Sequence, residues 1–318
     1  MTHRLALVGT GSMGALHARV ISQSERAELV RVIDPRAEAG RDVATRFSVD
    51  WTPEIDSLSD VDAVVLSAPT EMHHELALDV LHEGKPLLIE KPVANDLTEV
   101  RNILDVSAAR EVPLMCGLLE RYNPAVLTAR ALLGEPVHVR SARHGPYAAR
   151  IRTGVAWDLL VHDVDLAIQL FGGTTPRDTT AAAGYFHPQS LAGAEDTLEA
   201  LLSFDRGLAS VSASRIGQRK IRTLTVSELD RLIEIDLLRR DVTIYRHVSH
   251  EGVSDGGRGY RQQTVIEIPE LLTVREPLAS QLDRFLDLVE GSGDPDTERN
   301  SILPSHLVVS NVLTQAGC

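Results

Sequence analysis

Three spaced glycines near the start of the chain constrain its fold more than any other feature. Gly9, Gly11 and Gly14 follow a continuous apolar run, Leu5–Val8, and precede a helical pattern that continues to Ile21. A continuous apolar run is typical of a strand that is buried on both faces of a parallel sheet. The first glycine then permits a tight turn, the second lets backbone approach a pyrophosphate, and the third lets helix and strand pack closely. The motif therefore predicts a dinucleotide-binding βαβ unit.

An acidic residue, Asp34, stands twenty positions after the last of these glycines, at the end of the next apolar run. A carboxylate in this place accepts hydrogen bonds from ribose hydroxyls and repels a 2′-phosphate, so the sequence favours NAD over NADP. Arg36, two residues later, keeps NADP as an alternative because an arginine pairs well with that phosphate. Further cofactor contacts are expected in the glycine turn and in two later loops, from Ser12, Met13, Ser67, Pro69, Thr70, His73, Glu90 and Lys91.

Strand and helix patterns alternate through the first 120 residues. After the first βα unit, strands are expected at residues 29–33, 61–66, 86–89 and 112–116, and helices at residues 36–47, 71–82 and 96–110. This alternation predicts a doubly wound parallel sheet of the α/β class. We therefore assign residues 1–120 to a Rossmann domain that binds NAD(P).

Residues 121–318 follow a different pattern and are assigned to a second domain for substrate binding and oligomerisation. Helices are expected at residues 122–133, 155–171 and 276–290, and strands at residues 137–143, 178–185, 197–204, 208–214, 222–227, 231–236, 242–248 and 263–268. Residues 251–260 are rich in glycine and are expected to form a mobile hairpin loop. Turns at such short intervals predict a large, open, mostly antiparallel sheet with one helical layer against it. The other face of the sheet needs a cover, which a homo-oligomer would provide.

The composition excludes several classes of partner. Acidic residues outnumber Lys plus Arg by 45 to 32, which gives a net charge of −13 and argues against binding to nucleic acid or to an anionic membrane. No stretch approaches the ~20 apolar residues of a membrane span. Cys116 and Cys318 provide neither a disulfide framework nor a zinc spacing. These features indicate a cytoplasmic protein.

Lysine is scarce, since Lys85, Lys91 and Lys220 are the only three in the chain. Lys91 follows a predicted strand in the triplet Glu90-Lys91-Pro92. In open α/β sheets ligands bind beyond the carboxyl ends of the strands, so Lys91 is expected to reach the nicotinamide region. The alternative is a surface lysine without function.

A polar stripe runs along the predicted helix at residues 155–171. Asp158, His162, Asp165 and Gln169 fall within roughly 60° of one another at helical spacing. The stripe is either a solvated helix face or a face turned to a cleft, where His162 accepts and returns an alcohol proton while Asp158 orients the imidazole. Asp163 lies on the apolar side and is expected to bond with backbone or an arginine.

Two metal sites are possible alternatives, one from His162, Asp163 and Asp165 and one from His73 and His74. Neither has a convincing set of further ligands, so no metal is expected.

The GTGSMG, APTEMHH, EKP and DLLVHDVD segments together resemble the glucose–fructose oxidoreductase / inositol dehydrogenase (Gfo/Idh/MocA) family over most of the chain. The resemblance implies a Rossmann domain, an open-sheet domain, an NAD(P) cofactor and polyol or sugar substrates. It also implies dimers or tetramers that pack through the open sheets. Carried over residue by residue, it implies Lys91, Asp158 and His162 as the active-site set.

Residues 120–126, 143–146, 150–151 and 154–155 resemble branches of this family that act on nucleotide-linked amino sugars, such as UDP-N-acetylglucosamine 3-dehydrogenases. The expected reaction is hydride transfer between a secondary alcohol of the sugar, with C3 favoured, and nicotinamide. An arginine-lined cleft is expected for such an anionic substrate. The expected substrate contacts are Lys91, Arg121, Asn123, Tyr147, Arg150, Trp157, Asp158 and His162.

Two other functions stay open. One is an inositol or free-sugar dehydrogenase, and the other is a non-catalytic NAD-binding regulator built on the same fold. Residues 302–318 depart from the usual ending of the family, which affects the expected oligomer contacts and part of the substrate rim.

Overall fold

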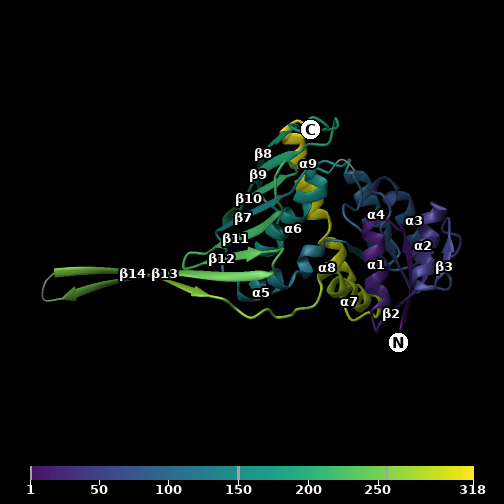
Figure 1. Cartoon of the computed structure of the whole chain (residues 1–318), viewed down its shortest axis with the longest axis horizontal. Coiled ribbons are helices and arrows are strands. Elements are labelled where there is room, and N and C mark those ends of the chain that lie inside the picture. Colours follow the sequence, from purple (N-terminus) through teal and green to yellow (C-terminus); the bar gives the residue numbers. More distant parts are fainter. Residues whose placement is uncertain (1, 149–150, 255–256) are drawn as a thin grey trace. The chain divides into compact units, whose positions relative to one another are not determined.

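The computed structural model describes residues 2–148, 151–254 and 257–318, so Arg150 lies outside the described residues. The chain forms two compact units (Figure 1). Residues 1–122 and 275–307 make up the first unit, and residues 123–274 and 308–318 make up the second. The predicted division at residue 120 differs from this arrangement in one respect, because residues 275–307 belong with the first unit.

The first unit contains a six-stranded sheet in which all neighbouring strands are parallel. From edge to edge its strands are β3 (Asp50–Thr52), β2 (Ala27–Ile33), β1 (His3–Val8), β4 (Ala63–Leu66), β5 (Leu87–Ile89) and β6 (Leu114–Cys116). Leu5, Leu7 and all of β4 are fully buried, as the continuous apolar runs predicted. The doubly wound parallel sheet is confirmed. The sequence missed β3, which has only three residues.

Helices complete the first unit. They are α1 (Ser12–Ser22), α2 (Ala37–Phe47), α3 (His73–His82), α4 (Leu97–Ala109), α7 (Pro277–Val289), α8 (Pro295–Asn300) and the start of α9 (Leu303–Ala316), with 3-10 turns at Thr70–Met72 and Leu119–Tyr122. On α7, Leu282, Phe285 and Leu286 are buried in the same core cluster as Leu5 and Leu7 of β1. This apolar face explains why the chain returns to the first unit after residue 275.

The second unit contains an eight-stranded sheet that is antiparallel except where β7 pairs with β10. From edge to edge its strands are β14 (Gly257–Glu267), β13 (Asp241–Ser254), β12 (Leu232–Asp236), β11 (Ile221–Ser227), β7 (His138–His144), β10 (Gly207–Ser214), β9 (Thr197–Phe204) and β8 (Asp178–Gly184). The mostly antiparallel second sheet is therefore confirmed.

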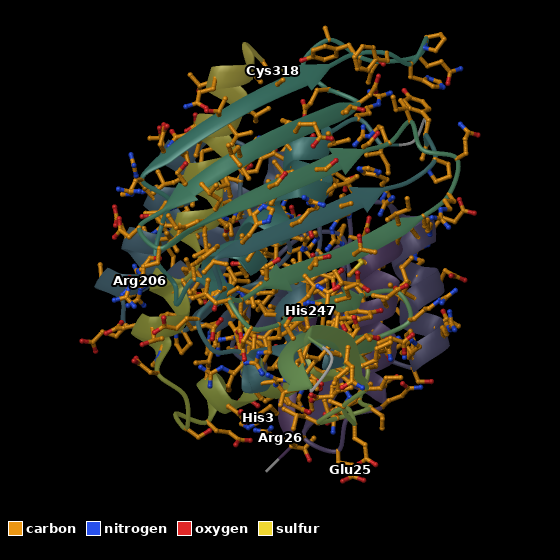
Figure 2. All side chains as sticks on the ribbon, turned by 90° about the vertical axis from the view of Figure 1, so that its left-hand side faces the viewer. His3, Glu25, Arg26, Arg206, His247 and Cys318 are labelled. Carbon is orange, nitrogen blue, oxygen red and sulfur yellow. The ribbon has the colours of Figure 1, made fainter. Side chains whose placement is uncertain are left out.

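One face of this sheet is covered by α5 (Pro124–Leu132) and α6 (Val161–Leu170) (Figure 1). Figure 2 looks onto the other face, across which no helix of the described residues lies. Leu201 and Leu208 are 43% and 44% exposed on their strands. Among the described residues, no helix has both the length and the apolar character that a membrane crossing requires.

Two expected elements of the second unit are different in the structure. The single helix expected at residues 155–171 begins instead with a π-helical turn, Ala156–Leu160, before α6. The glycine-rich segment expected as a mobile hairpin loop lies in a hairpin whose described residues are strands, because β13 and β14 stay paired up to Ser254 and Gly257. These strands extend as a hairpin beyond Tyr245, the last residue of β13 that pairs with β12 (Figure 1).

A buried ion pair fastens α6 to the sheet. Arg143 on β7 donates to both carboxylate oxygens of Asp163 on α6, at 2.7 and 3.2 Å. Each side chain is only 1% exposed. The predicted bond between Asp163 and an arginine is confirmed, and it fixes the rotation of α6 about its own axis.

Removing one member of this pair should destabilise the protein strongly, because the other charge stays buried without its partner. Arg143→Met and Asp163→Asn should each lower the free energy of unfolding by roughly 3–5 kcal/mol, measured by urea denaturation. The matched control is Arg177→Met, whose partner Asp205 lies 3.0 Å away with both side chains mostly exposed. That variant should lose less than about 1 kcal/mol. Equal losses for Arg143→Met and Arg177→Met would contradict the assignment.

Candidate active site

The glycine turn after β1 is closely packed. Gly9 has a φ of +92°, and a Cβ atom on it would lie 2.6 Å from the backbone of Ser67 and Ala68. A Cβ atom on Gly14 would lie 2.1 Å from the carbonyl oxygen of Gly9. A Cβ atom on Gly11 would meet nothing within 4 Å. The first and third glycines are therefore needed for the fold itself, whereas Gly11 faces open space.

The amino terminus of α1 at this turn is open to an anion. Gly11 provides no capping side chain, and the first turn has no acidic residue. The first helical bond runs from Ala15 N to Gly11 O, so the N–H groups of Ser12 and Met13 have no acceptor within the helix. The hydroxyl of Ser67 is buried and has no hydrogen-bond partner among the described residues. These donors fit the pyrophosphate of a dinucleotide.

Asp34 ends β2 and is 1% exposed. Its carboxylate accepts hydrogen bonds from Thr10 N and Oγ1 at 2.8 and 2.6 Å, and from three nitrogens of Arg36 at 2.7 to 3.0 Å. Burial alone would raise the pKa of Asp34, but the bonds from Arg36 and Thr10 outweigh it and hold this pKa well below its usual range. Asp34 is therefore a permanent anion beside the glycine turn.

A pocket of about 510 Å³ opens beside Asp34 within the first unit. It reaches from the glycine turn to the loop after β4, which includes Pro69. Its charged lining residues are Asp34, Arg36, Glu54, Glu75 and Asp79, so four acids face one arginine. Both the location and the charge suit an uncharged nucleoside better than one with an additional phosphate.

The segment Glu90-Lys91-Pro92 follows β5, as predicted, and the Lys91–Pro92 peptide bond is cis. Glu90 is 7% exposed, and its carboxylate accepts from His17 Nε2 at 2.8 Å and from Lys91 N at 3.2 Å. Burial would raise the pKa of Glu90, but the bond from His17 and the charges of His17 and Lys91 lower it overall. The side chain of Glu90 thus anchors the loop that carries Lys91.

Two more buried histidines bond with the backbone just after Lys91. His73 on α3 bonds with Pro92 O and Ala68 O, both at 2.9 Å, and burial lowers the pKa of His73 although these bonds oppose the shift. His306 on α9 accepts from Val93 N at 3.1 Å through Nε2, and its Nδ1 donates to Ile302 O. The histidine cluster, defined as His17, His73 and His306, therefore positions the Lys91 loop from three helices.

Sequence reasoning missed His17 and His306, and no local pattern marks them, because their partners are 73 and 213 residues away. Glu90 and His73, expected as cofactor contacts, instead bond within the protein. Arg121 donates to the hydroxyl and carbonyl of Ser301 at 2.7 and 2.9 Å, and its side chain is 10% exposed. Glu90, His73 and Arg121 are therefore bonded to other parts of the chain, and their expected ligand contacts stay predictions.

Asn123, another expected substrate contact, is 3% exposed. Its Oδ1 caps α5 by accepting from Ala125 N, and its Nδ2 donates to Leu237 O. The structure gives Asn123 a structural role.

In the second unit, Trp157 and Asp158 lie on the π-helical turn and His162 lies on α6. Asp158 Oδ2 is 3.4 Å from the guanidinium of Arg215, which also donates to Thr153 O at 2.6 Å. Glu195, 2% exposed, accepts from Ala156 N at 2.6 Å, and burial raises the pKa of this carboxyl. Arg215 and Glu195 thus position the turn, and the sequence analysis identified neither of them. π-Helical turns are frequent at functional sites.

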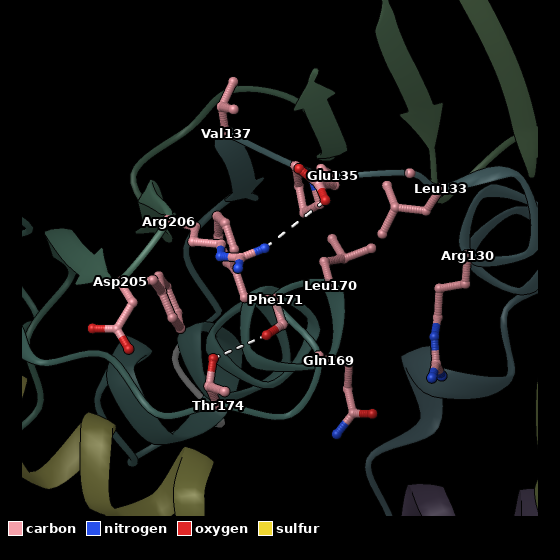
Figure 3. A pocket seen from close by; sticks show the side chains of 14 residues that line it. Arg130, Leu133, Glu135, Val137, Gln169, Leu170, Phe171, Thr174, Asp205 and Arg206 are labelled. Carbon is pink, nitrogen blue, oxygen red and sulfur yellow. Dashed lines mark hydrogen bonds and ion pairs between the residues drawn. The ribbon is translucent and has the colours of Figure 1, made fainter. Parts of the chain in front are cut away.

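The predicted polar stripe is only partly open. Asp158 and His162 are half-buried, whereas Asp165 is 2% exposed. Gln169 lines a second pocket of about 530 Å³ near the carboxyl end of α6, where Arg206 pairs with Glu135 at 3.8 Å (Figure 3). Arg130 and Asp205 also line that pocket, so acids balance arginines there. The pocket lies at the other end of the helix from Asp158. Asp158 and His162 are therefore the members of the stripe that suit catalysis.

The two metal alternatives gain no support from the geometry. His74 bonds with Asn102 Oδ1 at 2.9 Å and Asp163 with Arg143. Within the described ranges, no group of three or more His, Cys, Asp or Glu side chains is placed to hold a metal ion.

Two protein-family models match this chain. Residues 3–118 match the model described as "Oxidoreductase family, NAD-binding Rossmann fold", and residues 127–227 match the GFO/IDH/MocA C-terminal domain. The chain is 28% identical over 290 residues to UDP-N-acetylglucosamine 3-dehydrogenase of Acidithiobacillus ferrooxidans. This match covers 90% of this chain and 88% of that protein. It is 30% identical over 230 residues to an inositol 2-dehydrogenase of Rhizobium meliloti, which covers 68% and 69%.

Solved structures match over nearly the whole chain. The Acidithiobacillus ferrooxidans enzyme has the same fold, with a TM-score of 0.86, 24% identity, and coverage of 99% of this chain and 98% of that one. GenD2 from gentamicin A biosynthesis, solved in complex with NAD, gives a TM-score of 0.82, 26% identity, and coverage of 99% and 94%.

At Gly11 the effect of a substitution on folding can be distinguished from its effect on cofactor binding. Gly11→Ala should cost less than about 1 kcal/mol of stability, since its Cβ meets no atom. The same methyl group would obstruct the approach of a pyrophosphate, so the NADH dissociation constant should rise at least about tenfold in a fluorescence titration. Gly145→Ala, which also meets nothing within 4 Å, is the matched control and should leave NADH binding unchanged. Wild-type affinity in Gly11→Ala would overturn the assigned pyrophosphate site.

Proposed function

This chain belongs to the GFO/IDH/MocA oxidoreductase family, and we propose that it transfers a hydride between a secondary alcohol of a nucleotide-linked sugar, with C3 favoured, and NAD. The proposal rests on two groups of positioned residues, one in each unit. The first unit has an open helix terminus, a glycine turn and an anchored Lys91 loop. The second has a half-buried histidine and aspartate on a held helical turn.

We propose the following roles in alcohol oxidation. His162 accepts the hydroxyl proton, because an imidazole titrates close to neutral pH. Lys91 donates a hydrogen bond to the same oxygen and stabilises its developing negative charge. Asp158, held by Arg215, positions the substrate and the imidazole. A nicotinamide cofactor held by the first unit would supply the acceptor for the hydride of the alcohol carbon. The roles of Lys91 and His162 interchange if Lys91 is the base.

The chain's own residues would hold the cofactor as follows. Gly9, Gly11 and Gly14 with the N–H groups of Ser12 and Met13 would receive the pyrophosphate. Asp34 would receive the adenosine ribose, and the loop with Ser67, Pro69 and Thr70 would line the path towards the nicotinamide. Arg36 pairs with Asp34, so a 2′-phosphate would have to compete with that carboxylate for the guanidinium.

NAD should be preferred to NADP by at least about tenfold, because four carboxylates line the pocket beside Asp34. Titration of protein fluorescence with NADH and NADPH measures this ratio. Asp34→Asn should reduce the preference for NADH over NADPH, because it removes the negative charge next to the adenosine ribose. Asp56→Asn is the matched control, since Asp56 is 62% exposed and pairs with Arg31 on the surface of the same unit. An equal preference for both cofactors in the wild type would refute the NAD assignment.

The similarity to UDP-N-acetylglucosamine 3-dehydrogenase, which extends over 90% of this chain, supports a nucleotide-linked substrate. The inositol 2-dehydrogenase similarity, over 68%, favours the second candidate, an inositol or free-sugar dehydrogenase. Both candidates share the chemistry and differ only in the substrate.

A substrate screen decides between them. NAD reduction should be fastest with UDP-N-acetylglucosamine and slower by at least about tenfold with N-acetylglucosamine, free hexoses and inositols.

His162→Asn and Lys91→Met should each lower kcat at least about 100-fold, the usual contribution of a positioned acid–base group. Lys85→Met is the matched control, because the Lys85 ammonium bonds with Val61 O away from the Lys91 loop. Turnover near the wild-type rate in both site variants would exclude this mechanism.

We also propose that the open face of the eight-stranded sheet is covered by a second copy of the chain, as a homodimer or homotetramer that works in the cytoplasm. The exposed leucines on β9 and β10 support this proposal. A light-scattering mass equal to that of one chain at micromolar concentration would exclude it.

A further inference from the structure

Aromatic residues are scarce in this chain, with 5 Phe, 2 Trp and 5 Tyr in 318 residues. Three of the twelve, Tyr147, Tyr185 and Phe186, lie directly after β7 and β8. Both strands run parallel to β10, so these loops leave the sheet at the same end. The rings of Tyr147 and His187 stack there with centroids 3.6 Å apart and planes 8° apart. We name Tyr147 and His187 the ring pair.

The ring pair is fixed in place by main-chain and side-chain bonds. The Tyr147 hydroxyl donates to Gln189 O at 2.7 Å. Asp196, 1% exposed, accepts from the backbone N–H groups of Phe186 and His187, both at 2.8 Å, and from the Ser190 hydroxyl. Both loops are therefore held, although the rings themselves are only half-buried.

Further bonds connect the loop that carries His187 to the proposed reaction site. Arg215 N donates to Asp196 O at 2.8 Å, and the Arg215 guanidinium lies 3.4 Å from Asp158. Glu195, next in the chain to Asp196, accepts from Ala156 N on the π-helical turn. Asp196, Arg215 and Glu195 thus link the loop that carries His187 to the turn that carries Asp158.

Two cations lie in a loop that is hydrogen-bonded to the Tyr147 loop. Arg219 and Lys220 lie in the loop between β10 and β11, which is held against the Tyr147 loop by a bond from Gly217 N to Gly145 O at 3.0 Å. Both side chains are exposed, and neither pairs with an acid among the described residues. In a chain with a net charge of −13 and three lysines, two adjacent unpaired cations suit an anionic ligand.

We propose that the ring pair binds the nucleobase of the substrate and that Arg219 and Lys220 bind its diphosphate. This inference rests on the proposed function and names the part of the site that selects a nucleotide-linked sugar over a free one. A flat base extends a stack of rings, and such stacking tolerates any base. Lysine and arginine supply the charge-assisted hydrogen bonds that phosphate oxygens accept.

The test measures binding of UDP to the NADH-loaded protein by calorimetry. His187→Ala and Tyr147→Leu should each weaken UDP binding about tenfold, a typical loss for one stacking partner, with NADH affinity unchanged. The double variant Arg219→Ala/Lys220→Ala should weaken UDP binding and reduce its dependence on salt. His247→Ala is the matched control, because His247 is exposed on β13, near the opposite edge of the same sheet (Figure 2). That control should bind UDP like the wild type.

Steady-state kinetics keep this inference separate from the proposed function. The ring-pair variants should raise KM for UDP-N-acetylglucosamine by more than they lower kcat, and circular dichroism should show a folded protein. If the wild type oxidises UDP-N-acetylglucosamine but His187→Ala and Tyr147→Leu leave KM unchanged, the nucleobase assignment is wrong and the function stands. If the wild type neither binds UDP nor oxidises any nucleotide sugar, both the function and the assignment fall.

Discussion

The Arg143–Asp163 ion pair determines which face of α6 meets the sheet, and the proposed catalytic groups depend on that choice. Two opposite charges that are each 1% exposed cannot be separated without leaving one of them buried without the opposite charge. The pair therefore selects one rotation of the helix with far less ambiguity than apolar packing would. Leu160, Val161, Val164 and Ile168 fill the surrounding core. With Asp163 turned to β7, His162 and Asp158 stay half-exposed, as does Gln169 nearer the carboxyl end of α6.

The Lys91 loop depends on a comparable constraint, the need of buried polar groups for partners. Glu90 is too deeply buried to be left without donors, and Val93 N and Pro92 O lie in the same interior. The histidine cluster meets these needs from α1, α3 and α9. Because α9 follows the helix α7 that packs on the first unit, the late return of the chain supplies His306 to a loop more than two hundred residues earlier. Histidine suits the position at His306, since that ring accepts from Val93 N and donates to Ile302 O.

Sequence patterns identified the parts of the fold that are determined locally. Continuous apolar runs predicted the parallel strands, and the spacing of glycines predicted the turn at Gly9. The π-helical turn was missed because a regular 100° period was assumed through Asp158, and side-chain patterns do not register one additional residue per turn. The roles of Arg215, Glu195 and His306 arise from contacts between distant segments, which periodicity does not encode. The sequence predicts Asn123 as a ligand contact, although an Asn before a proline is also a helix-cap signal.

The pair of Asp34 and Arg36 illustrates how one carboxylate serves both the fold and a ligand. Asp34 is almost completely buried, whereas the Arg36 side chain is 63% exposed. Moving Arg36 into solvent is therefore inexpensive, because an exposed cation keeps its hydration. The bonds from Thr10 would stay and keep Asp34 in place. Ribose hydroxyls could then replace the guanidinium donors one for one, so the carboxylate would keep its full set of hydrogen bonds with or without a nucleotide.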